Sequence, residues 1–290
     1  MPEDGTSAAL TRSFSHNIED YPDGIVLPVD KPYRWTSADV IRKIKFAAIR
    51  HFGKKNLKVG HAGTLDPLAT GILLVCIGPA TRRAEELQRS PKEYVAGVSF
   101  GATTPSYDLE KEIDCECPLD GVSEAALRAA LPQFLGEQDQ VAPLFSAKSV
   151  DGVRAYETAR RLLREAQREG RAFDPGEALQ SSRINIYDLE LLSWHDAPVQ
   201  DFVDDGLGRI RVASVEGHHL PTAMIRVACS KGTYIRALAR DLGEALGSGA
   251  FLSSLRRTRN GGYTLEDSWT LDEVLAAFSP AATGYPPEGI

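Results

Sequence analysis

The sequence predicts an α+β protein with a mixed sheet. Segments with strand-like and helix-like spacing alternate along its 290 residues, but they lack the regular rhythm of a doubly wound parallel fold. Hydrophobic residues make up 42% of the chain, which is enough to bury a substantial core. The length allows one large domain or two modest ones.

The N-terminal part contains a predicted strand and a well-capped helix. Residues 25–29 form a short apolar run, and Pro32 cannot continue a hydrogen-bonded ladder. Thr36 precedes Asp39 by the spacing of a capping box, and an apolar stripe with helical period follows. We therefore expect a strand and then an amphipathic helix.

Further elements follow from apolar runs and alternation. Residues 94–100 alternate so that Tyr94 and Phe100 fall on one side, which is typical of a strand with one buried face. Gly247 stands where a helix over 234–246 would end in a left-handed turn. We also expect strands at 72–77, 184–194, 210–215 and 223–229, and helices at 80–89, 123–131 and 153–168.

Composition excludes several classes of protein. No apolar run approaches the roughly 20 residues that span a bilayer. Residues 1–21 are polar and lack the basic and apolar regions of a secretory signal. Four cysteines are too few for a disulfide scaffold, and the spacing of Cys115 and Cys117 does not suit zinc. We expect a reduced, cytoplasmic protein without a metal and without contact to a membrane.

Charge is unevenly distributed along the chain. The formal net charge is −7, yet residues 31–60 contain nine lysines and arginines against the single acid Asp39. Such asymmetry suits a protein that grips phosphates with one face, although a solvated helix with a lysine-rich loop would look the same.

The segment from Gly60 to Gly71, GHAGTLDPLATG, places one carboxylate, Asp66, between flexible glycines. Asp before Pro is also a common helix start, so a capping role for Asp66 is an alternative to a chemical one. His61 lies five residues before the acid and is able to donate to a phosphate or a sugar. A structural role for this histidine is equally compatible with the sequence.

Three other segments carry candidate binding residues. Tyr94 opens a predicted strand and suits either the core or a stacking platform for a base. Residues 230–236, SKGTYIR, join a strand to a helix, where exposed amides and Arg236 suit an anion. Residues 255–259, LRRTR, form a dense cationic stretch that is plausible for an RNA backbone.

Together these motifs resemble the TruB family of pseudouridine synthases. The matching blocks occur in the family's order over residues 24–258, and GHAGTLDP is highly specific among them. The other blocks are LPVDKP at 27–32, KEY at 92–94, GATTPSYD at 101–108, PLFSAK at 143–148, residues 230–236 and LRR at 255–257. The resemblance implies the pseudouridine synthase fold, with a largely antiparallel central sheet flanked by helices and loops.

The resemblance also implies a role for individual residues. Asp66 matches the catalytic aspartate, and Arg236 matches the arginine that pairs with it. Tyr94 would stack on the uracil and is a candidate to take a proton in the last step. The remaining implied substrate contacts are His61, Tyr234, Leu255 and Lys31. No cofactor is implied, because the reaction involves neither redox change nor hydrolysis.

By resemblance, the chain isomerises the uridine at position 55 in the T-loop of tRNA to pseudouridine. Its partner would be the T-arm stem-loop, and no obligate protein partner is evident. A non-catalytic RNA-binding or RNA-folding protein on the same scaffold is the alternative. An acid beside bound phosphates favours the enzyme, because a binding module has no need for it.

We expect three parts along the chain. Residues 1–22 would form a flexible extension, and residues 23–258 a catalytic domain with an RNA-gripping insertion at about 138–182. Residues 259–290 form a segment too short for the RNA-binding module that many relatives carry.

Overall fold

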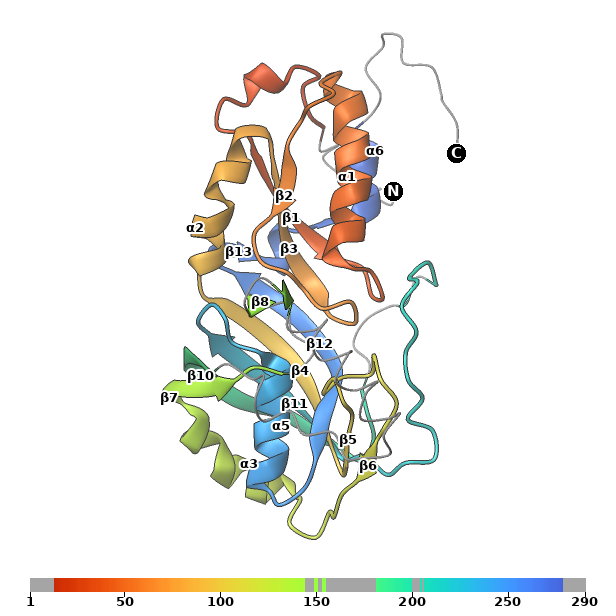
Figure 1. Cartoon of the computed structure of the whole chain (residues 1–290), viewed down its shortest axis with the longest axis vertical. Coiled ribbons are helices and arrows are strands. Elements are labelled where there is room, and N and C mark those ends of the chain that lie inside the picture. The colour runs from red at the N-terminus through yellow and green to blue at the C-terminus, as the bar shows by residue number, and fades with distance from the viewer. Residues whose placement is uncertain are drawn as a thin grey trace, which may run out of the picture.

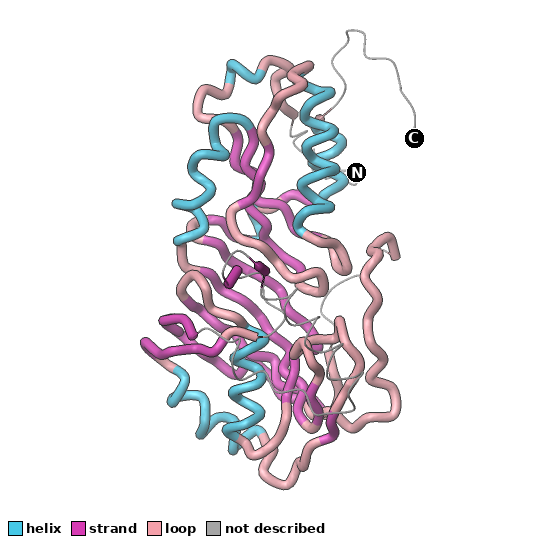
Figure 2. The backbone as a smooth tube through the Cα atoms, in the orientation of Figure 1, coloured by secondary structure: helices cyan, strands magenta, loops and turns pink. Residues whose placement is uncertain are grey.

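The computed structural model describes residues 13–143, 149–150, 153–154, 181–199, 204 and 206–278. Within these residues, ten strands form one sheet, which runs through both halves of an elongated molecule (Figure 1). Helices lie outside the strands in both halves (Figure 2). The α+β class predicted from the sequence is confirmed.

The sheet has the strand order β14-β1-β3-β12-β4-β11-β10-β7, with β2 on β3 and β13 on β12. Pairing is antiparallel except between β1 and β14 and between β12 and β3, so the sheet is mixed and largely antiparallel as expected. The strands are β1 (Ile25–Lys31), β2 (Val59–His61), β3 (Thr70–Ile77), β4 (Lys92–Phe100), β7 (Gly136–Val141), β10 (Ser181–His195), β11 (Thr222–Cys229), β12 (Ala250–Asn260), β13 (Tyr263–Thr264) and β14 (Trp269–Thr270).

Helices flank each half of the sheet. α1 (Ser37–Phe52), α2 (Ala84–Arg89) and α6 (Leu271–Ala277) accompany the upper half in Figure 1, and α3 (Glu124–Ala130) and α5 (Ile235–Ala245) the lower half. The pairs β5 (Ala102–Thr103) with β6 (Cys115–Glu116) and β8 (Ser149–Val150) with β9 (Val153–Arg154) stand apart from the main sheet.

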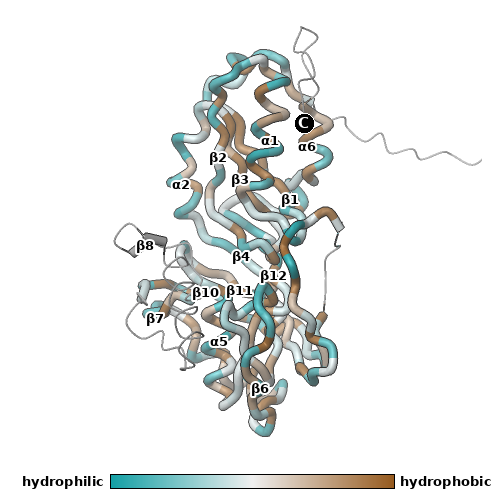
Figure 3. Tube along the Cα trace, turned by 45° about the vertical axis from the view of Figure 1, so that its right-hand side comes forward, coloured by the Kyte–Doolittle hydropathy of each residue, from teal (hydrophilic) through white to brown (hydrophobic). Residues whose placement is uncertain are grey.

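The start of α1 forms as its sequence predicts. Thr36 Oγ1 accepts a hydrogen bond from the Asp39 amide, and the Asp39 carboxylate accepts one from the Thr36 amide, which completes the capping box. Val40, Ile44 and Ala48 are fully buried on the face that meets the sheet. Figure 3 shows that hydrophobic residues also concentrate along β3, which the upper helices cover.

β12 joins the two halves of the sheet. It pairs with β4 in antiparallel fashion along most of its length and with β3 in parallel at Arg256 and Arg257. At this crossing Gly71 has φ +94°, and a Cβ atom there would lie 2.2 Å from the Arg257 carbonyl oxygen. Only glycine therefore allows β3 to approach β12 this closely.

The strand over residues 250–260 was not expected from the sequence, because polar side chains interrupt its alternation. Ser254, Arg257 and Asn260 are all buried in it. The strand expected at 210–215 is wrong: this segment pairs with no strand and crosses the surface as an extended strap. Its apolar side chains pack instead on a small cluster that includes Leu109 and Phe251.

Both ends of the described chain pack against the main sheet. Within residues 13–22, expected to be a loose extension, Phe14 stacks on Phe278 with ring centroids 4.7 Å apart, and Ile18 is buried. β14 extends the sheet beside β1, and α6 packs near α1, so residues 259–278 complete the sheet edge. Residues 1–12 and 279–290 lie outside the described residues.

The insertion expected at 138–182 is described only in part. β7 covers its first residues and β10 its last, while residues 144–148 of the PLFSAK block lie outside the description. Of the helix expected at 153–168, only Val153 and Arg154 are described, and they form strand β9.

The crossing of β3 and β12 yields a stability test. Gly53 and Gly71 both have positive φ, but only Gly71 is crowded by backbone atoms. We expect Gly53→Ala to lower the free energy of unfolding by about 1 kcal/mol, and Gly71→Ala by about 3 kcal/mol or more. Urea unfolding of both variants measures this, and equal losses would contradict the close approach.

Candidate active site

A cleft of about 600 Å³ lies between the upper and lower halves of the sheet, and Asp66 is in its wall. Residues 62–69 connect β2 to β3 without forming a helix, and the Ala69 amide donates to the Asp66 carbonyl at 3.1 Å in a turn. Asp66 therefore does not cap a helix, which removes the structural alternative considered for it. Its side chain is 36% exposed and remains reachable from the cleft.

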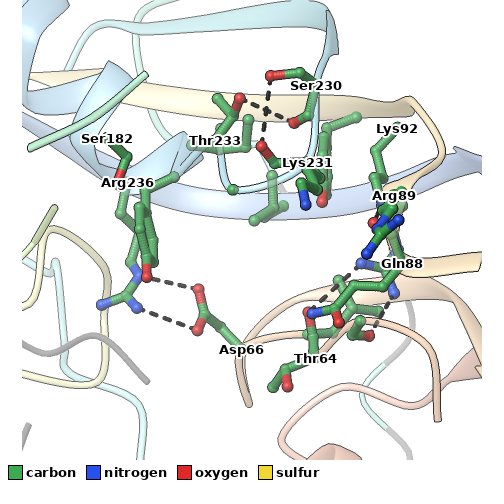
Figure 4. A pocket seen from close by; sticks show the side chains of 18 of the residues that line it. Thr64, Asp66, Gln88, Arg89, Lys92, Ser182, Ser230, Lys231, Thr233 and Arg236 are labelled. Carbon is green, nitrogen blue, oxygen red and sulfur yellow. Dashed lines mark hydrogen bonds and ion pairs between the residues drawn. The ribbon is translucent and has the colours of Figure 1, made fainter. Parts of the chain in front are cut away.

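Arg236, the second residue of α5, holds both oxygens of this carboxylate. Nε lies 2.9 Å from Oδ2 and Nη2 lies 3.1 Å from Oδ1, so the two groups form a planar two-point contact (Figure 4). Nη1 donates to the Ser106 carbonyl at 3.0 Å. With these bonds the guanidinium cannot turn, and the carboxylate plane is fixed in the cleft wall.

A second carboxylate, Asp108, lies behind this pair. Its Oδ2 is 3.7 Å from Arg236 Nε, and both side chains are more than nine-tenths buried. Burial raises the pKa of Asp108, and the guanidinium opposes that rise. Burial lowers the pKa of Arg236, but Asp66 and Asp108 outweigh it and raise the pKa overall. One buried cation thus faces two acids.

Three contacts clamp the loop that carries Asp66. Ser37 Oγ accepts from the Leu65 amide at 3.0 Å and donates to the Leu65 carbonyl at 3.1 Å. Lys31 Nζ donates to the carbonyls of Pro67, Trp35 and Pro32 at 3.1, 2.6 and 2.9 Å. Burial lowers the pKa of Lys31 to about 7, while Asp66 and Asp30 oppose the drop.

The third clamp is Arg257 on β12. Its side chain is 1% exposed, and it donates to the carbonyls of Ile72 and Gly63 at 2.7 and 3.2 Å. No ion pair joins it to a carboxylate of the described residues. Its guanidinium carbon lies 6.0 Å from the centre of the Tyr94 ring. Arg257 therefore places an unneutralised charge in the wall of the cleft while it shapes the loop.

The cleft is electropositive. Its lining contains the acids Asp66 and Glu85 and six cations: Arg89, Lys92, Arg183, Lys231, Arg236 and Arg257. Burial lowers the pKa of Lys92 to about 8, and Arg257 and Lys231 contribute to that shift. An excess of cations over the two acids of the lining suits a polyanionic ligand on which an acid acts.

Two family models together match residues 50–286. The TruB family pseudouridylate synthase N-terminal domain matches residues 50–235, and the tRNA pseudouridylate synthase B C-terminal domain matches residues 236–286. The chain belongs to the TruB family.

Relatives in the TruB family are similar over most of their length. The tRNA pseudouridine synthase B of Phocaeicola vulgatus is 44% identical over 255 residues, which cover 87% of this chain and 92% of the relative. The protein of the same name from Thermus thermophilus is 40% identical, with coverage of 85% and 76%. A crystal structure of a Cbf5–Nop10–Gar1 complex matches with a TM-score of 0.57 and 27% identity, over 90% of this chain and 56% of that one.

The cleft brings together most of the residues predicted from the TruB resemblance. Asp66, Tyr94, Tyr234, Arg236 and Leu255 all line it. The ion pair expected between Asp66 and Arg236 is present. Burial raises the pKa of Tyr94 against the opposing charge of Arg257, so the resting phenol is neutral and suits stacking.

Two predicted substrate contacts lie elsewhere. Lys31 is fully buried and does not line the cleft, because its ammonium group donates hydrogen bonds to backbone carbonyls. This geometry favours a role in holding the loop rather than contact with substrate. His61 ends β2 outside the cleft lining and is half-buried. Burial, with help from Arg257, lowers the pKa of His61 and favours the neutral imidazole.

The sequence did not indicate Asp108 and Glu110 as parts of this site, and it indicated Arg257 only as one residue of a cationic stretch. Asp108 and Arg257 stood inside matched blocks, but their burial beside Arg236 and the loop appears only in the fold. The basic segment 31–60 was expected to face the substrate, yet none of its residues lines the cleft. The cations of the cleft come from separate parts of the chain.

Glu110 provides a pH-dependent test of the charges around Asp66. Burial, Asp108 and Asp66 together raise its pKa from 4.5 to about 7. The folded state therefore binds the proton more tightly than the unfolded state, and wild-type stability falls as the pH rises through this window. Glu110→Gln does not titrate, so its stability advantage should grow to at most about 3 kcal/mol above pH 7.

Urea unfolding of both proteins at about pH 5 and about pH 8 measures this difference. The advantage of the variant should be several-fold larger at the higher pH. The same difference at both pH values would show that Glu110 is not held in its neutral form.

Proposed function

We propose that this protein converts a uridine of tRNA to pseudouridine. The observation that carries the proposal is an accessible carboxylate, Asp66, fixed by Arg236 in the wall of a cation-rich cleft. Membership of the TruB family and the similarity to proteins named tRNA pseudouridine synthase B support it. No described helix is long and apolar enough to cross a membrane.

The reaction breaks the N-glycosidic bond between uracil N1 and the ribose C1′, turns the base and forms a bond from C5 to C1′. The proton on C5 leaves and N1 gains one, so the product is an isomer of the substrate. Asp66 would add to the ring, attack C1′ or remove a sugar proton, and each route starts from an ionised carboxylate. Because Arg236 occupies one lone pair of each oxygen, a second on each is open to the substrate.

The cleft supplies the other needs of this chemistry. The uridine must leave the folded loop, which costs a few kcal/mol of unstacking. Tyr94 offers an aromatic face to the extruded base, and Leu255 forms an apolar wall that excludes water. The exposed cations of the lining, Arg89, Arg183 and Lys231, would neutralise phosphates of the RNA on either side.

We also propose the finer identity of the substrate. The TruB resemblance indicates the uridine at position 55, in the T-loop, and recognition of the T-arm stem-loop without an obligate protein partner. RNA recognition of this kind relies on loop shape and extruded bases. Since tRNA is the substrate, the protein would act in the cytoplasm. Residues 23–258 form the catalytic domain in this proposal.

A substitution at Asp66 tests the proposal. Asp66→Asn should abolish turnover, because an amide cannot supply the anionic oxygen, while tRNA affinity should stay within about tenfold, or about 1.4 kcal/mol. Carbodiimide mapping of an unmodified tRNA transcript measures the product and its position. The matched control is Asp188→Asn, which changes an exposed acid outside the cleft.

Full activity in Asp66→Asn would overturn the catalytic role and favour the alternative of an RNA-binding protein. A transcript in which the T-loop uridine is replaced by cytidine tests the position. Product elsewhere in that transcript would overturn the specificity but not the chemistry.

A further inference from the structure

A second cavity, of about 390 Å³, lies at the start of α1 and has no role in the proposed reaction. One wall is the turn before α1 together with the first part of α1, and the other is residues 207–209, which lead into the strap of residues 210–215. Figure 1 shows this strap in cyan, rising on the right toward the foot of α1, and Figure 3 brings it forward. The cavity is lined by Arg34, Arg42, Lys43, Arg209 and Asp39, together with the apolar residues Trp35 and Leu207.

The two walls are fixed to one another. Arg34 Nε donates to the Ile210 carbonyl at 2.7 Å, and Nη1 pairs with Asp204 at 3.1 Å. The backbone of Gly208 packs so closely that a Cβ there would lie 2.2 Å from the Cβ of Arg34. The cavity is thus a built feature of the fold.

The positive charges that line this cavity outnumber the acids that pair with them. Arg34 pairs with Asp204, and Arg42 pairs with Asp39 at 2.8 Å. Lys43 and Arg209 are exposed and make no ion pair with a carboxylate in the described part of the chain. The Lys43 ammonium lies 4.6 Å from the centre of the Trp35 ring, which directs it along the cavity wall. Two positive charges are therefore available to an anion.

The cavity is next to the catalytic loop but separate from the cleft. The two share no lining residue. Lys31 lies between them, because its ammonium binds the carbonyl of Trp35 on one side and that of Pro67 on the other. RNA that enters the cleft at Asp66 and continues past this loop would meet the cavity.

We propose that this cavity binds the phosphate backbone of the same tRNA, at a segment outside the T-arm. The inference rests on the proposed function, since it takes tRNA as the ligand of the neighbouring cleft. Lys43 and Arg209 add an electrostatic contact that a free T-arm hairpin cannot make.

The test compares two RNAs and two matched variants. Lys43→Gln combined with Arg209→Gln removes two charges at the cavity, and Lys45→Gln combined with Arg50→Gln removes two exposed charges elsewhere on α1. Affinity is measured for an unmodified full-length tRNA transcript and for a T-arm hairpin at several salt concentrations. Circular dichroism and unfolding midpoints show that each variant is folded.

The cavity variant should bind full-length tRNA about tenfold more weakly and reduce its salt slope by about 1 to 2, with hairpin affinity changed less than about twofold. The control variant should change both affinities little. Equal weakening for the two RNAs, no weakening of either, or the same effect in the control would overturn the inference. Wild-type protein that modifies neither RNA would instead overturn the proposed function.

Discussion

The site depends on one buried guanidinium. Arg236 is 6% exposed, and a charge this deep is stable only when acids and carbonyls surround it. Asp66 from the loop between β2 and β3 meets that demand together with Asp108 and the Ser106 carbonyl from the segment between β5 and β6, whereas Arg236 itself lies in α5. The requirement to neutralise Arg236 therefore draws the loop between β2 and β3 toward α5 and closes one wall of the cleft.

The strand β12 supplies the second constraint. It crosses from the lower half of the sheet to the upper half, and Arg257 from its middle donates to carbonyls of the Asp66 loop. Lys31 from β1 reaches the same loop from the opposite side. Arg257 and Lys31 thus donate to backbone carbonyls and form no ion pair with Asp66. Arg236 is the residue that binds the Asp66 carboxylate. The cleft thus presents Asp66 among an excess of cations, so that its charge does not repel a polyanion.

The sequence predicted elements whose signals are local. The α1 helix was found because a capping box and a 3.6-residue apolar period coincide, and β4 because its alternation is regular. β12 was missed because buried Ser254, Arg257 and Asn260 have partners that only the tertiary fold supplies. The strap was taken for a strand because its apolar side chains alternate, although they pack on loops rather than in a sheet.

The sequence likewise predicted only part of the site. The ion pair of Asp66 with Arg236 joins residues 170 positions apart, so no spacing within the sequence contains it and only the family resemblance indicated it. Lys31 was predicted as a substrate contact only by the TruB resemblance, whereas the fold buries it among carbonyls. Charge density along the chain placed the RNA-facing cations at 31–60. The cleft instead gathers its cations from four distant segments, while Lys43 of the basic segment lines the second cavity.

The central claim is that the two-point geometry of Arg236, and not merely its charge, prepares Asp66 for reaction. Arg236→Lys keeps the charge but cannot hold both carboxylate oxygens in one plane. The most direct measurement is the single-turnover rate of this variant on a saturating tRNA transcript, together with its tRNA affinity. We expect the rate to fall at least about 100-fold, or about 2.7 kcal/mol, with affinity nearly unchanged. A rate equal to that of the wild type would contradict the account.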